Sequence, residues 1–341
     1  MGPHLYLDHA ATTPLLPVAR AAMEEGFALW ANPSSPHRAG RAARAALEDA
    51  RERVRAALGW QGEVIFTSGA SEALAIAMQR CVQPLTAISP VEHEAALRHA
   101  GDAQRLAVDA LGRVSPQDCA LPGLVCVQQV NNETGVIQPL DEIAQAVHEA
   151  GGLLLADCAQ GAGKIALPGA DLAVLSAHKF GGPVGIGALL LRDWGQIQPS
   201  GGQERGYRPG TENLPGALAM AAALEAGADW MAEASRLRAR LETAMAAAGG
   251  EVVAAEAPRI ATIGAYRMKG KAAAAQLIRF DGLGMAISAG SACSSGSLRA
   301  SHVLTAMAYP HTSEVIRVSI GRETTEADID QFAQAWAQVA G

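Results

Sequence analysis

Two apolar segments within residues 153–182, LLLADCAQGAGKIALPGADLAVLSAHKFGG, decide the fold class of this protein. The runs 153–156 and 172–175 have the length and composition of buried strands, and each run leads into polar residues. Strand-like and helix-like stretches alternate in the same way through the first two-thirds of the chain. That alternation is typical of a mostly parallel sheet with helices on its faces, so we predict an α/β fold.

The remaining pattern divides the chain into two parts. Further strands are expected over 64–67, 85–89, 124–127 and 186–191, and helices over 36–58, 71–80 and 140–150. After about residue 225 a long amphipathic helix ends at Gly249-Gly250, a strand is expected over 315–320, and a helix from about Thr325 closes the chain. Because a chain of 341 residues suits about two domains, we expect a large α/β domain followed by a smaller α+β domain.

Composition and charge exclude several classes of protein. Hydrophobic residues make up 49% of the chain and charged residues 18%, which excludes intrinsic disorder. The net charge of −7 argues against general binding to nucleic acid or to anionic lipid. Neither a signal peptide nor a transmembrane helix is expected. Five scattered cysteines without a CxxC pair argue against disulfides and zinc, and favour the reducing cytoplasm.

Lys179 and Asp157 are the strongest candidates for chemistry. Each follows a predicted strand, and one strand–connection–strand unit separates them, so both should emerge at the same carboxyl edge of the sheet. A lysine leaving a buried strand can lose its proton readily and attack an aldehyde. An aspartate opposite such a lysine is what pyridoxal phosphate needs, because the carboxylate keeps the pyridine nitrogen protonated. An exposed lysine and a loop-capping aspartate are the ordinary alternatives.

A possible phosphate site lies at residues 67–72, TSGASE, between a predicted strand and a predicted helix. Small residues at a helix N-terminus leave backbone N–H groups free, and Ser71 adds a hydroxyl. An ordinary capping turn is the alternative. The two common phosphate-loop motifs, Gly-x4-Gly-Lys-Ser/Thr and Gly-x-Gly-x-x-Gly, do not occur in the required context.

His93 lies in the sequence Glu92-His93-Glu94, after the predicted strand 85–89. The pair His93-Glu94 begins like a zinc-protease motif, but Leu97 occupies the position of the second histidine, so no metal site is expected. The remaining interpretations are a histidine that lies flat over a heteroaromatic ring and an exposed loop histidine.

Cys293 differs from the other cysteines in its surroundings. Residues 288–297, SAGSACSSGS, are all small apart from this cysteine, which suits a thiolate that must move between two places. An incidental exposed cysteine is the alternative. Cys126, inside a predicted strand, and Cys158, beside Asp157, are better explained by core packing.

Arg317 lies among apolar residues in the predicted strand 315–320. A guanidinium in that position needs a buried anion, and a carboxylate bound through two hydrogen bonds is its best partner. A ligand carboxylate and a structural salt bridge are about equally good interpretations.

Taken together, these motifs resemble the cysteine desulfurases of the NifS/IscS type, within the class V aminotransferase group of fold-type-I pyridoxal phosphate enzymes. The resemblance runs nearly from end to end, in the family's order. The matching stretches are Leu7–Pro14, Asn32–Ser35, Phe66–Glu72, Val91–His93, Val130–Gly135, Asp157–Gln160, Ser176–Lys179, Gln203–Gly206, Arg208, Gly210–Asn213 and Gly290–Ser294.

The resemblance implies the fold in more detail. It predicts a fold-type-I pyridoxal-phosphate-dependent transferase, whose large domain (15–248) contains a mostly parallel sheet of the seven-stranded type flanked by helices. The small α+β domain would combine residues 1–14 with 249–341 and carry the cysteine loop. The chain ends at Gly341, soon after the last predicted helix begins, so we expect the C-terminal extension that longer relatives use to dock an iron–sulfur scaffold to be absent.

The resemblance also implies a cofactor, pyridoxal 5′-phosphate, and the residues of the site. The catalytic residues would be Lys179, which binds the aldehyde and takes the Cα proton, Cys293, which accepts sulfur, and His93, which stacks on the ring. The other cofactor ligands would be Asp157 at the ring nitrogen, Gln160 at the phenolic oxygen, and Ala70, Ser71, Ser176 and His178 at the phosphate. Thr211 would reach the phosphate of the other subunit in a homodimer. The substrate carboxylate would be bound by Asn32, Asn132 and Arg317.

The implied function is the conversion of L-cysteine to L-alanine, with a persulfide formed on Cys293. The sulfur would pass to an acceptor protein, an iron–sulfur scaffold or a small thiol, for iron–sulfur cluster assembly or other sulfur trafficking. Direct binding to nucleic acid or membrane is not expected. Two alternatives stay open: another class V enzyme, such as an aminotransferase or selenocysteine lyase, and a low-activity sulfur-relay subunit.

Overall fold

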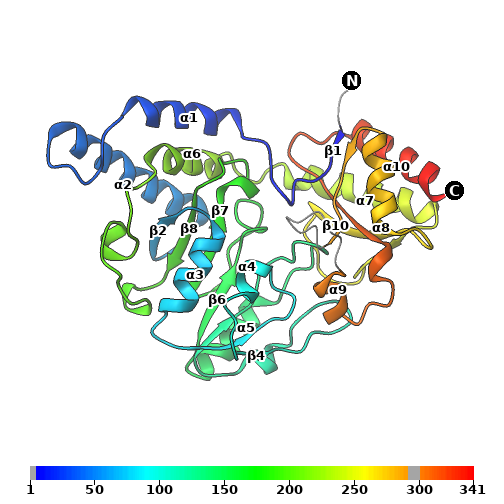
Figure 1. The fold of residues 1–341 in the computed structure, drawn as a ribbon, viewed down its shortest axis with the longest axis horizontal. Helices are drawn as coiled ribbons and strands as arrows, with labels where there is room; N and C mark the ends of the chain where they lie inside the picture. Colours follow the sequence, from blue (N-terminus) through cyan, green and yellow to red (C-terminus); the bar gives the residue numbers. More distant parts are fainter. Residues whose placement is uncertain (1–4, 291–299) are drawn as a thin grey trace.

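The computed structural model describes residues 5–290 and 300–341 (Figure 1). The helices are α1 (Pro17–Ala28), α2 (Arg38–Leu58), α3 (Ala70–Arg80), α4 (Glu94–Leu97), α5 (Leu140–Glu149), α6 (Leu214–Glu225), α7 (Met231–Ala247), α8 (Ala273–Gly282), α9 (His302–Ala306) and α10 (Glu326–Ala340). The strands are β1 (Leu5–Tyr6), β2 (Glu63–Thr67), β3 (Leu85–Ile88), β4 (Gln104–Arg105), β5 (Leu124–Cys126), β6 (Leu153–Asp157), β7 (Leu172–Ser176), β8 (Gly187–Leu191), β9 (Glu251–Val252), β10 (Ile263–Arg267), β11 (Met285–Ala286) and β12 (Val315–Ser319).

A seven-stranded sheet in the order β2-β8-β7-β6-β5-β3-β4 forms the centre of the larger part of the molecule. Only β8 runs antiparallel to its neighbours, and the other pairs in this sheet are parallel. The predicted α/β fold with a mostly parallel sheet is therefore confirmed. The predicted strands and helices of this region are also present, with boundaries that differ by one or two residues.

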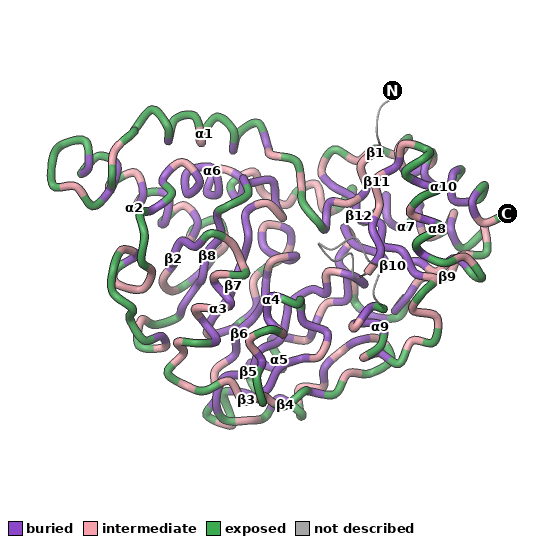
Figure 2. The backbone as a smooth tube through the Cα atoms, viewed as in Figure 1, coloured by how far each residue is buried: buried purple, intermediate pink, exposed green. Residues whose placement is uncertain are grey.

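Helices cover both faces of this sheet, which explains why its strands are apolar throughout instead of alternating. Leu154 and Ala156 of β6 pack in one core with residues of α2, α5 and α6. Leu155, between them, packs in a second core with residues of α3 and α4 on the opposite face. All residues of β7 and β8 are buried, and Figure 2 shows how buried segments fill the middle of the sheet.

Helix α6 lies inside the larger part of the molecule, packed against α1 and α2 (Figure 1). It has no polar face, and Gly26 of α1 approaches Pro215 so closely that a Cβ atom would lie 2.5 Å from the Pro215 Cα. Because helix prediction depends on a polar and an apolar face, the sequence pattern did not reveal α6. In the described part of the chain, no helix is both long enough and apolar enough to cross a membrane.

A separate hydrophobic core joins the beginning and the end of the described chain. Leu5 and Leu7 pack with residues of α7, α8 and α10, and β1 pairs in parallel with β11. Figure 1 shows β1 on the same side of the molecule as α7, α8 and α10. The other strands here form an antiparallel sheet in the order β12-β10-β9. The domain limits, 15–248 and 1–14 with 249–341, remain predictions.

A buried ion pair fixes the loop after β8 to the edge of the central sheet. The side chains of Arg51 and Glu204 are 2% and 1% exposed, and their closest atoms lie 2.8 Å apart. Glu204 also accepts a hydrogen bond from the backbone N–H of Phe66 in β2, at 3.0 Å. The buried pair of Arg51 and Glu204 therefore fixes the position of β2, the strand that leads into the predicted phosphate loop.

We predict that Arg51→Met lowers the free energy of unfolding by about 3–5 kcal/mol, because it leaves the Glu204 carboxylate buried without its cation. Arg53→Met is the matched control, since Arg53 pairs with Glu225 at the surface and should cost no more than about 1 kcal/mol. Chemical denaturation of both variants measures the difference. Equal losses in the two variants would contradict this account.

Candidate active site

A cavity of about 860 Å³ opens at the carboxyl ends of β6 and β7, where residues of the central sheet face residues of β12. Most of the residues that the sequence singled out line it. They are Ala70, Ser71, His93, Asn132, Asp157, Gln160, Ser176, His178, Lys179 and Arg317. Segments that are far apart in the sequence thus contribute to one site, at the edge where ligands bind in α/β proteins.

Lys179 lies in a short 3₁₀ turn that directly follows β7. Its Nζ donates hydrogen bonds to the carbonyl oxygens of Ala10 and Ala11, at 2.6 and 2.8 Å. Burial and the nearby Arg317 lower the pKa of Lys179 to about 8, although Asp157 opposes the shift. A substantial fraction of the amine is therefore neutral near physiological pH, and a neutral amine is a nucleophile and a base.

Asp157 is the last residue of β6, beside β7 in the sheet, so both side chains reach the same edge as predicted. Its Oδ1 accepts a hydrogen bond from the backbone N–H of Ala159 at 2.9 Å. Burial raises the pKa of this carboxyl group, while Ala159, His93 and Lys179 counteract the rise. Among the described residues no lysine or arginine forms an ion pair with it, so its carboxylate is available to a cationic group of a ligand.

Gln160 also presents an unused polar group. Its Nε2 donates to the Ala10 carbonyl at 2.9 Å, the same oxygen that accepts a bond from Lys179. The other amide atom, Oε1, is buried and has no hydrogen-bond partner. Since buried polar groups are almost always paired, this amide is suited to a polar atom of a ligand in the cavity.

The N-terminus of α3 forms the third polar region of the cavity. Its N-cap, Gly69, has φ = 153°, a conformation that residues with a Cβ rarely adopt, and no side chain caps the helix. The first N–H groups of α3, at Ala70 and Ser71, are thus open to an anion. Ser176 and His178 line the same cavity, and burial together with Lys179 lowers the pKa of His178 to about 4, so this ring is neutral at pH 7.

Arg317 combines both interpretations that its sequence context allowed. Its Nη2 lies 2.8 Å from the Asp8 carboxylate, and its Nη1 donates to the Asn132 carbonyl at 2.9 Å. The Nε atom is buried and has no partner. A structural ion pair therefore exists, and one N–H remains for a second anion.

His93 borders the cavity at the start of α4, where its Nδ1 accepts a hydrogen bond from the N–H of Ala95 at 3.1 Å. This bond assigns the proton of the neutral ring to Nε2. Burial of the ring lowers the pKa of His93, and the nearby Asp157 partly opposes this shift.

Two of the predicted residues that the structure describes do not line the cavity of their own chain. Asn32 is exposed and accepts a hydrogen bond from the Ser34 N–H at 2.9 Å, and Thr211 is exposed in the loop before α6. Cys293 lies outside the described residues. Gly290 and Ala300, the nearest described residues on its two sides, both line the cavity.

Two acidic residues near the site were not singled out as functional from the sequence. Asp8 pairs with Arg317, and its place in the Leu7–Pro14 motif was the signal that could have revealed it. Glu92 is completely buried, and its Oε1 accepts a bond from the Gln128 N–H at 2.7 Å. Burial and the neighbouring Asp157 raise the pKa of Glu92 well above its usual value. Glu92 lies within the Val91–His93 motif, but that motif did not indicate that the glutamate is buried.

A lysine and an aspartate at one sheet edge, with an anion site in the same cavity, are the groups that a pyridoxal-phosphate-dependent enzyme needs. Comparison with known proteins agrees. The family model described as Aminotransferase class-V matches residues 5–332, so the chain belongs to the class V aminotransferase family. Within that family it is similar to cysteine desulfurases. It is 37% identical to the "Cysteine desulfurase" of Cereibacter sphaeroides (97% of this chain, 94% of the relative) and 36% identical to "Cysteine desulfurase 2" of Trichormus variabilis (97% and 91%).

Solved structures agree with this assignment. A NifS-like protein from Rickettsia africae superimposes with a TM-score of 0.91 at 28% identity, covering 99% of both chains. The structure described as SspA in complex with cysteine has a TM-score of 0.80 at 28% identity, over 94% of this chain and 99% of that one. The resemblance seen in the sequence motifs is thereby confirmed.

Enzymes of this family depend on pyridoxal phosphate, and the cavity fits that cofactor. The carboxylate of Asp157 suits its protonated ring nitrogen, and the unpartnered amide end of Gln160 suits a polar ring substituent. The open N-terminus of α3 suits its phosphate. The amine of Lys179, with its lowered pKa, suits the cofactor aldehyde.

We predict that the rate of covalent labelling of Lys179 by pyridoxal phosphate rises with pH, reaches half of its maximum near pH 8 and then levels off. The lowered pKa means that the amine loses its proton there instead of near 10.5, and only the neutral amine attacks an aldehyde. Borohydride trapping of the apoprotein at a series of pH values, with peptide mass spectrometry, measures the rate. Labelling of Lys269, a lysine at the surface, in the same samples provides the control. A Lys179 profile that follows that of Lys269 would contradict the assignment.

Proposed function

We propose that this protein is a pyridoxal-phosphate-dependent cysteine desulfurase, which converts L-cysteine to L-alanine and transfers the sulfur to Cys293 as a persulfide. The observation that carries the proposal is the single cavity bordered by Lys179, Asp157 and the two residues that flank the cysteine segment, Gly290 and Ala300. The family membership and the cysteine desulfurases among its relatives support the same reaction.

The residues of the large sheet supply the proton chemistry. Bound pyridoxal phosphate would provide the electron sink that acidifies the Cα–H bond of the substrate. Asp157 would keep the ring nitrogen protonated, and His93 would stack on the ring. Lys179 would remove the proton at Cα and return one later, a role for which a pKa of about 8 is well matched. Gln160, Ala70, Ser71, Ser176 and His178 would hold the remaining polar groups of the cofactor.

The residues around β12 would orient the substrate. Arg317 and Asn132 line the cavity near Lys179, and the free Nε–H of Arg317 can bind a carboxylate. The thiolate of Cys293 would then attack the substrate sulfur: an S–S bond forms, the C–S bond breaks, and its electron pair remains with the carbon skeleton. Protonation of that skeleton yields alanine.

We predict that Cys293→Ala reduces sulfide release from L-cysteine, under reductant, by at least about 100-fold, because the nucleophile is missing. The native protein should release alanine and sulfide in equal amounts. Cys81→Ala is the control and should keep full activity. Cys81 is a partly exposed thiol at the C-terminal end of α3, whereas the N-terminal end of this helix lines the cavity. Undiminished sulfide release by Cys293→Ala would refute the persulfide role.

A homodimer would complete the cofactor site. Thr211 is exposed at the surface, and its neighbour Asn213 donates to the Gly185 carbonyl at 3.4 Å, beside the rim of the cavity. Two large apolar side chains shortly before Asn32 in the sequence are exposed: Phe27 is 60% exposed and Trp30 is 89% exposed. Surfaces of this kind on a folded protein commonly contact another chain. Thr211 would reach the phosphate bound by the partner.

Thr211→Ala should therefore weaken binding of pyridoxal phosphate by about tenfold while the protein stays dimeric, because one hydrogen bond to the phosphate is lost. Cofactor titration followed by absorbance, with light scattering for the molar mass, measures both quantities. A protein that is monomeric at micromolar concentration would refute the dimer, and unchanged cofactor affinity in the variant would refute the role of Thr211.

The sulfur would pass to an acceptor protein, such as an iron–sulfur scaffold, or to a small thiol, within the cytoplasm. The cysteines in the described structure, Cys81, Cys119, Cys126 and Cys158, are all unpaired, which supports a reducing compartment. If Cys293→Ser released alanine from cysteine at the full rate without a persulfide, the protein would instead be another class V enzyme. A protein that stays colourless with added pyridoxal phosphate would be a sulfur-relay subunit.

A further inference from the structure

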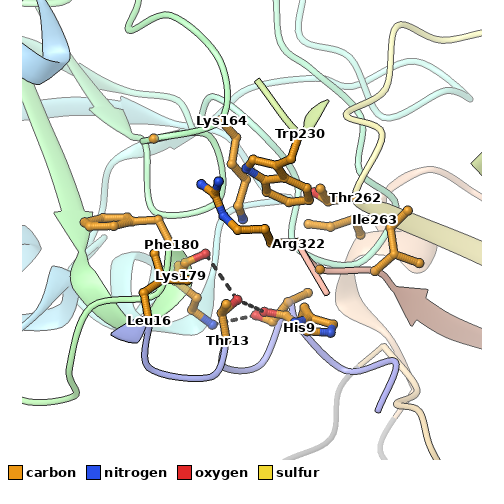
Figure 3. A pocket seen from close by; sticks show the side chains of 14 residues that line it. His9, Thr13, Leu16, Lys164, Lys179, Phe180, Trp230, Thr262, Ile263 and Arg322 are labelled. Atoms are coloured by element: carbon orange, nitrogen blue, oxygen red, sulfur yellow. Dashed lines mark hydrogen bonds between the residues drawn. The ribbon is translucent and has the colours of Figure 1, made fainter. Parts of the chain in front are cut away.

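A second, small cavity lies beside the catalytic lysine. Its volume is about 20 Å³, and both Lys179 and Ala10 border it as well as the main cavity. Figure 3 shows Lys164 reaching into it beside Trp230 and Arg322, with His9 and Lys179 across from them. A cavity of this size has room for one occupant about as large as a water molecule.

The charges around this cavity are all positive. Lys164, Lys179 and Arg322 line it, and none of the described residues that line it is acidic. Lys164 is 8% exposed, donates one hydrogen bond, to the Gln160 carbonyl at 3.2 Å, and forms no ion pair in the described part of the chain. Placing an isolated ammonium group in a buried site is costly, and burial with the nearby Lys179 lowers the pKa of Lys164 to about 7.

Two polar side-chain atoms of residues that line the cavity have no hydrogen-bond partner. The hydroxyl of Thr262, in a residue that is 3% exposed, and the Nδ1 atom of His9, in a residue that is 6% exposed, form no hydrogen bond. Burial and the positive charge of Lys164 lower the pKa of His9 to about 4, so its ring is neutral at pH 7. A threonine hydroxyl, a neutral imidazole and an ammonium group can all act as donors.

We propose that this cavity is a binding site for one monovalent anion of halide size, held by the ammonium group of Lys164 with Thr262 and His9 as further donors. A water molecule could satisfy the same donors, but only an anion would also compensate the charge of the protonated form of Lys164, and its binding would favour that form. The site is separate from the predicted phosphate site, because neither Ser71 nor Ser176 lines it.

The anion would join four segments that lie far apart in the chain. His9 precedes α1, Lys164 follows β6, Thr262 precedes β10, and Arg322 follows β12. These segments come from the central sheet and from the core that contains β10 and β12. An anion that binds only the folded protein therefore stabilises the contact between the two parts.

Thermal unfolding of the cofactor-loaded protein in sodium chloride and in sodium gluconate, at equal ionic strength, tests the proposal. Chloride should raise the midpoint by about 2–4 °C. Lys164→Met should remove this difference between the two salts, whereas Lys269→Met, at an exposed lysine, should keep it. Equal midpoints in the two salts for the native protein, or a chloride effect that persists in Lys164→Met, would overturn the proposal.

Crystals of the native protein grown with sodium bromide provide a second test that needs no variant. The anomalous signal of bromide should appear between Lys164, Thr262 and His9. If Lys164→Met does not fold, Thr262→Val replaces it in the unfolding experiment and should reduce the chloride effect. A cavity that holds only water, without anomalous signal, would overturn the proposal.

Discussion

The packing of the segment before α1 against the carboxyl edge of the central sheet is the contact on which the rest of the site depends. The N–H groups of Thr13 and Leu16 donate to the carbonyls of His178 and Gly181, at 2.8 and 2.9 Å. The free amine of Lys179 donates to the carbonyls of Ala10 and Ala11. That segment is attached on its other side to β12, because Asp8 pairs with Arg317 and the Ala10 N–H donates to the Ser319 hydroxyl. The reactive amine is therefore buried between two separate cores, and its lowered pKa is a consequence of that burial.

The charged groups around the buried amine also affect the pKa of Lys179. Positive groups are concentrated near the lysine, and Arg317 makes the ammonium form of Lys179 less stable while Asp157 and Asp8 favour it. Opposing effects of this kind set the pKa of a catalytic lysine between the value for an isolated buried amine and that for an exposed one. The site thus keeps Lys179 close to the pH at which it can exchange a proton in both directions.

Much of the fold and of the site could be predicted from the sequence, for identifiable reasons. Strands such as 153–157 and 172–176 are buried on both faces, so their composition identified them, and the order of elements identified the sheet. Asp157 and Lys179 were found together because parallel neighbouring strands end at one edge. The pattern did not reveal α6, because a helix that is apolar on every side has no periodicity to detect. Nor did it reveal the burial of Lys164 or Glu92, since burial of a charged residue is decided by tertiary packing.

The central claim is that the cavity at the ends of β6 and β7 delivers sulfur from L-cysteine to Cys293. Mass spectrometry of the cofactor-loaded protein after brief incubation with L-cysteine, without reductant, tests it most directly. The account predicts one additional sulfur atom on the peptide that contains Cys293, removed by a thiol reductant and absent from a Lys179→Ala protein. Formation of alanine with no added sulfur on that peptide, or with the sulfur on another cysteine, would contradict it.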